Sequence, residues 1–332
     1  MKLGILTSFH GHIENYTKAC EELNIDYEVI DFVSANWLDN IRNAKVDGVL
    51  CHPPCDFQER KSMLDERLYF VDKYLKLPIY PNFDSLYIYE NKRNMAYWLE
   101  VNNIPHSKTK VITTKQEAED FFKDTTYPVV LKSNIGAGGN MVHFIESQRS
   151  SSKYIRQIFG YKGGLFCKGL SPRFKKYGIP FKLTGGAQKH YMVLQEFHKI
   201  KWEWRIIKIG NTYSGHKKLL KGHKASGSGL VGWDHPPAEL LYFVKDICDK
   251  GKFDSMAVDI FETVDGQYLV NELQAMFGAH IPYQMKKDGK PGMFLYTDKD
   301  GFVFEEGEFY RLKGNLLRIS HFVEKLIGNK NN

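Results

Sequence analysis

Short apolar runs and amphipathic segments alternate along the N-terminal part of the chain. Residues 2–8 and 27–32 are short and mostly apolar, and between them apolar side chains recur at helical spacing from Ile13 to Leu23. Apolar positions three or four apart lie on one face of a helix, whereas short apolar runs bounded by polar turns indicate strands. The pattern therefore predicts a strand, a helix and a second strand, which is the start of a βαβ layer.

The next segments extend this layer. A third apolar run over 46–51 ends at Pro53 and Pro54, because proline cannot donate a hydrogen bond within a central strand. A charged amphipathic helix is predicted over 56–75, and a last strand over 77–82. We therefore place the end of an N-terminal domain near residue 88.

Helices, strands and hairpins alternate in the rest of the chain. A helix predicted over 88–103 stops before Pro105, since the residue preceding a proline disfavours the helical conformation. A strand over 109–112, a helix over 115–122 and a strand over 128–133 follow. No repeat of fixed period and no low-complexity tract interrupts this order. The pattern predicts a mixed α/β protein.

A glycine-rich hairpin follows the strand that carries Lys132. Gly136, Gly138 and Gly139 fall in the loop before a second apolar run. Glycine lets backbone N–H groups approach a polyphosphate closely, and a nearby lysine supplies positive charge. The loop is not a Walker loop, because no Gly-Lys-Ser/Thr follows, and it is not a Rossmann fingerprint, because it does not open a helix. A flexible turn without a ligand explains the loop equally well.

A second group of candidate residues lies on two later strands. An apolar strand ends in Gln195, Glu196 and Phe197, and the next predicted strand carries Glu203 and Arg205 on one face. The edge of the first strand can hydrogen-bond an adenine, while Glu203 can reach a ribose hydroxyl. Arg205 can reach a phosphate or a substrate carboxylate. Two ordinary strands joined by a turn are the alternative.

Oxygen ligands gather on a third predicted hairpin, which turns at Gly266. Asp259 lies on its first strand, and Glu272 and Gln274 lie two residues apart on its second. Two residues apart on a strand, Glu272 and Gln274 share a face. Magnesium prefers oxygen ligands, commonly one or two carboxylates together with substrate phosphates. Carboxylates within apolar strands are unfavourable unless a cation pairs with them, so the hairpin predicts a magnesium site.

These motifs together resemble the ATP-grasp superfamily. The resemblance rests on a lysine on a helix before an Ile-Pro turn, a strand lysine with a glycine-rich hairpin, a Gln-Glu-Phe segment and a closing hairpin with acidic and amide side chains, and it covers residues 89–280. It implies an α/β protein of the ATP-grasp fold, in which an N-terminal βαβ (pre-ATP-grasp) domain precedes two α+β subdomains that clasp the nucleotide. The implied domains are 1–88, 89–197, with a lid at about 125–197, and 198–332.

The resemblance also implies an activity and a set of roles. The activity is an ATP- and Mg²⁺-dependent ligation, with Mn²⁺ as an alternative metal, that joins a carboxylate to an amine through an acyl phosphate. The nucleotide contacts it implies are Lys92, Lys132, Gly136, Gly138, Gly139, Gln195, Glu196, Phe197 and Glu203, and the metal ligands are Asp259, Glu272 and Gln274. Gln274 stands where the family has an asparagine, so its reach to the metal differs.

Further cations are expected along the reaction path. Arg205 and the pair Lys217 and Lys218 would stabilise the transferred phosphate and the oxyanion. An acceptor pocket is expected where the N-terminal domain faces the nucleotide, lined by candidates chosen from its loops and helix: His10, His52, Arg60 and Arg67. A sugar acid or a surface polysaccharide is the carboxylate that the resemblance suggests, and a homodimer is one assembly it allows.

The distribution of charge adds a feature that the motifs do not contain. The net charge is +7, and residues 161–190 carry seven basic side chains and no acidic one. We interpret this stretch as a basic insertion in the lid. Aromatic residues interleave with its lysines, so a nucleic-acid-binding module is an alternative, although nucleic acid is not the partner we expect. A kinase that phosphorylates a small molecule without ligation is a second alternative.

Composition restricts the setting in which the protein is expected to work. Its 332 residues are 42% hydrophobic and 26% charged, which is ordinary for a globular protein with a sizeable core. Five scattered cysteines are an odd number and fit reduced thiols better than a disulfide framework. The sequence shows neither a leader pattern nor an apolar stretch long enough for a membrane span, so we expect a cytoplasmic protein.

Overall fold

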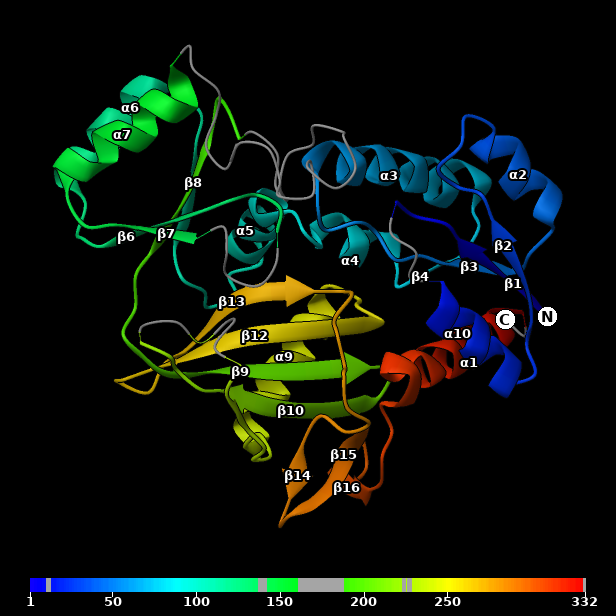
Figure 1. Ribbon diagram of the computed structural model, residues 1–332. Coiled ribbons are helices and arrows are strands. Elements are labelled where there is room, and N and C mark those ends of the chain that lie inside the picture. Colours follow the sequence, from blue (N-terminus) through cyan, green and yellow to red (C-terminus); the bar gives the residue numbers. More distant parts are fainter. Residues whose placement is uncertain (10–12, 137–141, 161–187, 223–224, 226–228, 331–332) are drawn as a thin grey trace, which may run out of the picture.

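The chain forms three sheets in succession (Figure 1). The computed structural model describes residues 1–332 except 10–12, 137–141, 161–187, 223–224, 226–228 and 331–332. Each sheet is built from a different part of the chain, and the second and third sheets lie across from each other beside the N-terminal layer. None of the described helices combines the length and the apolar character needed to cross a membrane.

The N-terminal sheet is parallel, in the order β2-β1-β3-β4. Its strands and helices alternate along the chain: β1 Lys2–Leu6, α1 Glu14–Glu22, β2 Asp26–Ile30, α2 Trp37–Ala44, β3 Gly48–Leu50, α3 Gln58–Phe70, the π-helical turn η1 Val71–Leu75, β4 Ile79–Tyr80 and α4 Phe83–Ile88. The apolar pattern predicts these elements except the short helices α2 and α4. Parallel strands need crossover connections, and the helices supply them. The carboxyl ends of β1 and β3 point toward the rest of the molecule (Figure 1).

The second sheet is antiparallel and has helices on one face (Figure 1). Helix α5 Lys92–Val101 leads into it, and its elements are β5 Thr109–Ile112, α6 Lys115–Asp124, β6 Val129–Lys132, β7 Val142–Ile145, α7 Gln148–Phe159 and β8 Met192–Glu196. The strand order is β5-β8-β6-β7. Because α6 and α7 cover one face, the other face is left for the third sheet.

The third sheet is the largest, and its central strands run in the order β13-β12-β9-β10. Its elements are β9 Ile200–Ile209, β10 Thr212–Lys218, β11 Val231–Gly232, α9 Ala238–Lys250, β12 Ser255–Thr263, β13 Tyr268–Gln274, β14 Lys286–Lys287, β15 Lys290–Thr297, β16 Gly301–Glu306, the 3-10 turn η2 Arg311–Gly314 and α10 Asn315–Lys330. Helix α9 lies against its outer face and α10 returns to the N-terminal layer (Figure 1).

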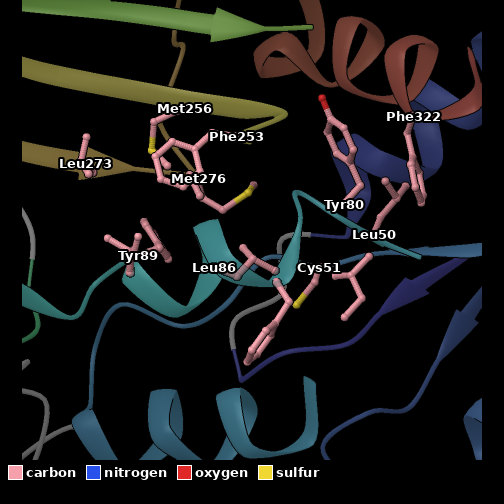
Figure 2. Close-up of a cluster of buried hydrophobic side chains, with 14 of the residues drawn as sticks. Leu50, Cys51, Tyr80, Leu86, Tyr89, Phe253, Met256, Leu273, Met276 and Phe322 are labelled. Carbon is pink, nitrogen blue, oxygen red and sulfur yellow. The ribbon is translucent and has the colours of Figure 1, made fainter. Parts of the chain in front are cut away.

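One hydrophobic core joins the N-terminal layer to the third sheet. Figure 2 shows side chains of Leu50 and Tyr80 from the first sheet beside Phe322 of α10, and Tyr89 and Met276 belong to the same core. All five are at least nine-tenths buried. A contiguous core of this kind holds the two layers at a fixed spacing, which positions the loops after β1 and β3 relative to the strands of the large sheet.

Candidate functional site

A largely apolar pocket lies between the second sheet and the large sheet. Its walls come from β6 to β9, β12 and β13 and include Val130, Lys132, Val142, Phe144, Gln195, Glu196, Phe197, His198, Ile200, Glu203, Ala225, Phe261 and Asn271. The Phe144 and Phe197 rings meet edge to face with centroids 5.9 Å apart. A flat aromatic ligand fits such a pocket, because its apolar walls bury the faces of the ring.

Four predicted pocket residues line this pocket: Gln195, Glu196, Phe197 and Glu203. Glu196 ends β8 and Phe197 follows it, and the Gln195 Nε2 atom donates to Thr109 Oγ1 at 3.2 Å, which holds that side chain against β5. Glu203 lies on β9, the next strand along the chain, and is only 1% exposed.

A chain of hydrogen bonds between charged groups runs along the polar end of the pocket. Lys132 Nζ donates to Asn271 Oδ1 at 2.8 Å, and Asn271 Nδ2 donates to Glu203 Oε2 at 3.0 Å. Lys218 forms ion pairs with both Glu203 and Asp259. All of these side chains come from strands and not from loops, so the backbone ladder fixes their positions.

A β-bulge explains why Asn271 points into the site although Glu272 follows it. Asp259 pairs with Glu272 and Ile260 pairs with Val270, so Asn271 is an extra residue on β13. A bulge locally breaks the alternation of side chains between faces and redirects one of them. Asn271 was absent from the sequence-based site, because its apolar surroundings gave no signal of a bulge.

The Asp259 carboxylate is fully buried and forms ion pairs with two cationic side chains. Arg205 donates to it through Nε and Nη2 at 2.8 Å each, and Lys218 Nζ lies 2.5 Å from Oδ2. Burial alone would raise the pKa of Asp259, but Arg205 and Lys218 outweigh burial and hold the pKa well below its usual range. The carboxylate is therefore ionised at neutral pH.

The same arginine joins Asp259 to the other predicted metal ligands. Arg205 Nη2 donates to Gln274 Oε1 at 3.0 Å, and Gln274 Nε2 donates to Glu272 Oε2 at 2.9 Å. Asp259 and Glu272 are register partners across β12 and β13. Directly opposed residues in an antiparallel pair have neighbouring side chains, so the two carboxylates lie side by side.

These oxygen atoms fit a divalent cation that prefers hard ligands. Two carboxylates and an amide oxygen leave room for phosphate oxygens and water, which is the composition of magnesium sites. Among the described residues, no group of three or more His, Cys, Asp or Glu side chains is arranged to hold a metal by itself.

Lys92 closes the site from the other side. Its Nζ lies 3.3 Å from Glu272 Oε1 and donates to the Gly136 carbonyl at 3.1 Å. Burial would lower the pKa of Lys92, but the Glu272 and Glu90 carboxylates raise it above its ordinary value. Lys92 therefore stays charged and joins the glycine-rich loop to the metal-ligand hairpin.

Some predicted residues are not brought to this cluster. Lys217 and Lys218 are neighbours on β10 and point to opposite faces, and Lys217 lies over the Trp202 ring at 4.3 Å and pairs with Asp234. Arg67 donates to the Phe32 and Ser34 carbonyls, which holds it within the N-terminal layer. These contacts hold both side chains away from the cluster around Asp259.

The remaining acceptor candidates lie at the edge of the N-terminal layer. Arg60 pairs with Asp56 at 2.7 Å and stacks on the Phe9 and Phe57 rings. His52 is partly buried in the loop after β3. The predictions for His10, Gly138, Gly139 and most of the basic insertion, residues 161–187, lie outside the described residues.

Curated relatives of this chain are ligases. Alpha-aminoadipate--LysW ligase LysX of Saccharolobus solfataricus is 28% identical over 215 residues, which cover 62% of this chain and 69% of that protein. Tetrahydromethanopterin:alpha-L-glutamate ligase of Methanocaldococcus jannaschii is 27% identical over 167 residues, which cover 49% of this chain and 57% of that protein. No protein-family model matches the chain.

The fold also matches solved structures. A RimK domain ATP-grasp protein from Sphaerobacter thermophilus superimposes with a TM-score of 0.53 at 14% identity, and the match covers 83% of this chain and 92% of that one. The predicted mixed α/β ATP-grasp fold, with a parallel N-terminal layer and antiparallel sheets, is confirmed.

Because Lys132 is buried at the pocket, we expect the stability of the protein to depend on pH. Burial lowers the pKa of Lys132 to about 8 from an ordinary 10.5. Between these values the unfolded chain binds more protons, so the free energy of unfolding rises with pH. Denaturant titrations from pH 7 to pH 11 should show wild type gaining about 2 to 3 kcal/mol relative to Lys132→Met across this window. Parallel pH curves for the two proteins would contradict the burial of a charged lysine.

Proposed function

We propose that this chain is an enzyme of the ATP-grasp superfamily, an ATP-dependent ligase that joins a carboxylate to an amine and releases ADP and phosphate. The observation that carries the proposal is the opposed pair Asp259 and Glu272, connected through Arg205 and Lys218 to a pocket that fits an adenine. The similarity to two curated ligases and the ATP-grasp fold support it.

In this proposal the adenine enters the apolar pocket and meets the backbone of Glu196 and Phe197 at the end of β8. Glu203 accepts from the ribose hydroxyls, because its carboxylate lines the same pocket. Lys132 and Lys92 turn toward the phosphates, which replace their present partners Asn271 and Glu272.

Asp259, Glu272 and Gln274 would hold magnesium in the nucleotide complex. When bound, the metal supplies positive charge to the β and γ phosphates and keeps them in line for transfer. Arg205 and Lys218 neutralise the Asp259 carboxylate here. With magnesium beside that carboxylate, the two side chains would be released toward the phosphates.

The chemical steps need positive charge from Arg205 and Lys218 and correct positioning of the substrates. A carboxylate oxygen attacks the γ-phosphorus, the bond to the ADP oxygen breaks, and an acyl phosphate forms. The amine then attacks the acyl carbon, phosphate leaves with the bonding electrons, and the amine nitrogen loses a proton to solvent or phosphate. Arg205 and Lys218 stabilise the oxyanion that forms after the amine attacks the acyl carbon and before phosphate leaves.

The substrates are proposed from chemistry and from the relatives. The names of both curated relatives contain an acidic α-amino acid, aminoadipate or glutamate. We therefore propose an amino acid as the source of the amine, and retain a sugar acid or surface polysaccharide as a candidate carboxylate. Arg60 and His52, on the edge of the N-terminal layer, are the acceptor-side residues of this proposal.

A screen of paired substrates tests the activity. Purified protein with ATP and Mg²⁺ is incubated with carboxylates and amines, singly and in pairs, and ADP is measured together with the mass of the product. Ligation predicts ADP release that requires both a carboxylate and an amine, with one amide formed per ADP. Equal ADP release with a single substrate, and a phosphorylated product, would indicate a kinase and contradict the ligase.

Two adjacent lysines provide a matched pair for the site assignment. Lys218→Ala should lower the rate of ADP release by about 10²- to 10³-fold, because the variant lacks one of the cations that stabilise the charge developing in the transition state. Lys217→Ala should change the rate less than about threefold, since its partners Asp234 and Trp202 lie on the other face. Equal losses in the two variants would contradict the placement of Lys218 at the reaction centre.

A further inference from the structure

Asn134, at the base of the glycine-rich loop, uses all four of its polar groups on four different residues. Its backbone N–H donates to Gln188 Oε1 at 3.0 Å, and its carbonyl accepts from the Lys92 N–H at 3.0 Å. Its Oδ1 accepts from the Arg93 N–H at 2.9 Å, and its Nδ2 donates to Gln58 Oε1 at 2.5 Å. The residue is 1% exposed, so water does not compete for these bonds.

The next glycine is fixed by the same neighbourhood. The Gly136 N–H donates to Glu90 Oε2 at 2.8 Å, while its carbonyl accepts from Lys92 Nζ. Gly136 has φ +123°, in the region that side chains disfavour. The first limb of the loop is therefore tied to the junction of α4 and α5 and does not swing independently.

Gln58 carries this connection into the N-terminal layer. It is the first residue of α3, and the preceding Phe57 forms no side-chain cap. The first N–H groups of a helix have no intrahelical acceptor, so an uncapped first turn frays readily. The Gln58 Nε2 atom donates to Ser62 Oγ at 3.3 Å, and its Oε1 accepts from Asn134, which pins this turn to the loop. Arg60 lies in the same turn.

We propose that Asn134 is a positioning residue that couples the phosphate end of the nucleotide site to the first turn of α3 through its hydrogen bond to Gln58. Phosphates bound beside Lys132 and Lys92 would hold Asn134 in place, because the Lys92 N–H donates to the Asn134 carbonyl, and Asn134 holds the turn that carries Arg60. Coupling between two sites is reciprocal, so a ligand bound at Arg60 favours nucleotide binding. The role rests on the proposed function, because it requires nucleotide at this site.

Hydrogen–deuterium exchange of the full chain tests the coupling with a single probe, the non-hydrolysable ATP analogue AMP-PNP with Mg²⁺. In wild type the analogue should slow exchange by about fivefold in peptides covering 57–62 as well as in those covering 130–136, because bound nucleotide stabilises Asn134 and with it the hydrogen bond to Gln58. Gln58→Leu and Gln58→Ala remove the acceptor and should abolish the slowing at 57–62 while keeping it at 130–136.

Two further variants separate coupling from general damage to α3. Gln58→Glu keeps an acceptor for Asn134 and should retain the slowing, and Ser62→Ala removes only the other partner of Gln58 and should also retain it. Slowing at 57–62 in Gln58→Leu equal to wild type would overturn the coupling, as would wild type protected only at 130–136. Wild type that fails to bind the analogue at all contradicts the proposed function, and the coupling with it.

Discussion

The ion pairs of Arg205 and Lys218 with the buried Asp259 carboxylate determine how the site is arranged. A buried carboxylate without cations is strongly unfavourable, so strands β9, β10 and β12 can pair here only if these three side chains meet. The two cations stand between the apolar pocket and the opposed residue Glu272, where a polyphosphate would need positive charge. The ion pairs that stabilise the sheet thus hold, in the same place, the groups that the proposed reaction uses.

Much of this arrangement follows from local patterns. The predicted strand over 109–112 is β5, and the hairpin carrying Asp259, Glu272 and Gln274 forms as two antiparallel strands. Period-two alternation is a local property of the backbone, and it correctly placed Glu203 and Arg205 on one face. The ATP-grasp resemblance then supplied the fold, which the match to a solved ATP-grasp structure bears out.

Other features depend on register or on distant segments. Alternation requires that only one of Lys217 and Lys218 faces the site, but the choice needs the pairing of β10 with β9. Asn271 enters the site through a bulge, and Asn134 meets residues more than 40 positions away in the chain. Neither leaves a periodic signal, because the partners come together only when the sheets pack.

In this account Asp259 and Glu272 bind a divalent metal together with nucleotide. Mn²⁺ binding in the presence of ADP tests this most directly. Electron paramagnetic resonance should detect Mn²⁺ bound to wild type with ADP, and Glu272→Gln should weaken that binding at least about tenfold. Glu262→Gln, on β12 but paired with Lys201 and two tryptophans, is the matched control and should bind as wild type. Unchanged Mn²⁺ affinity in Glu272→Gln would contradict the account.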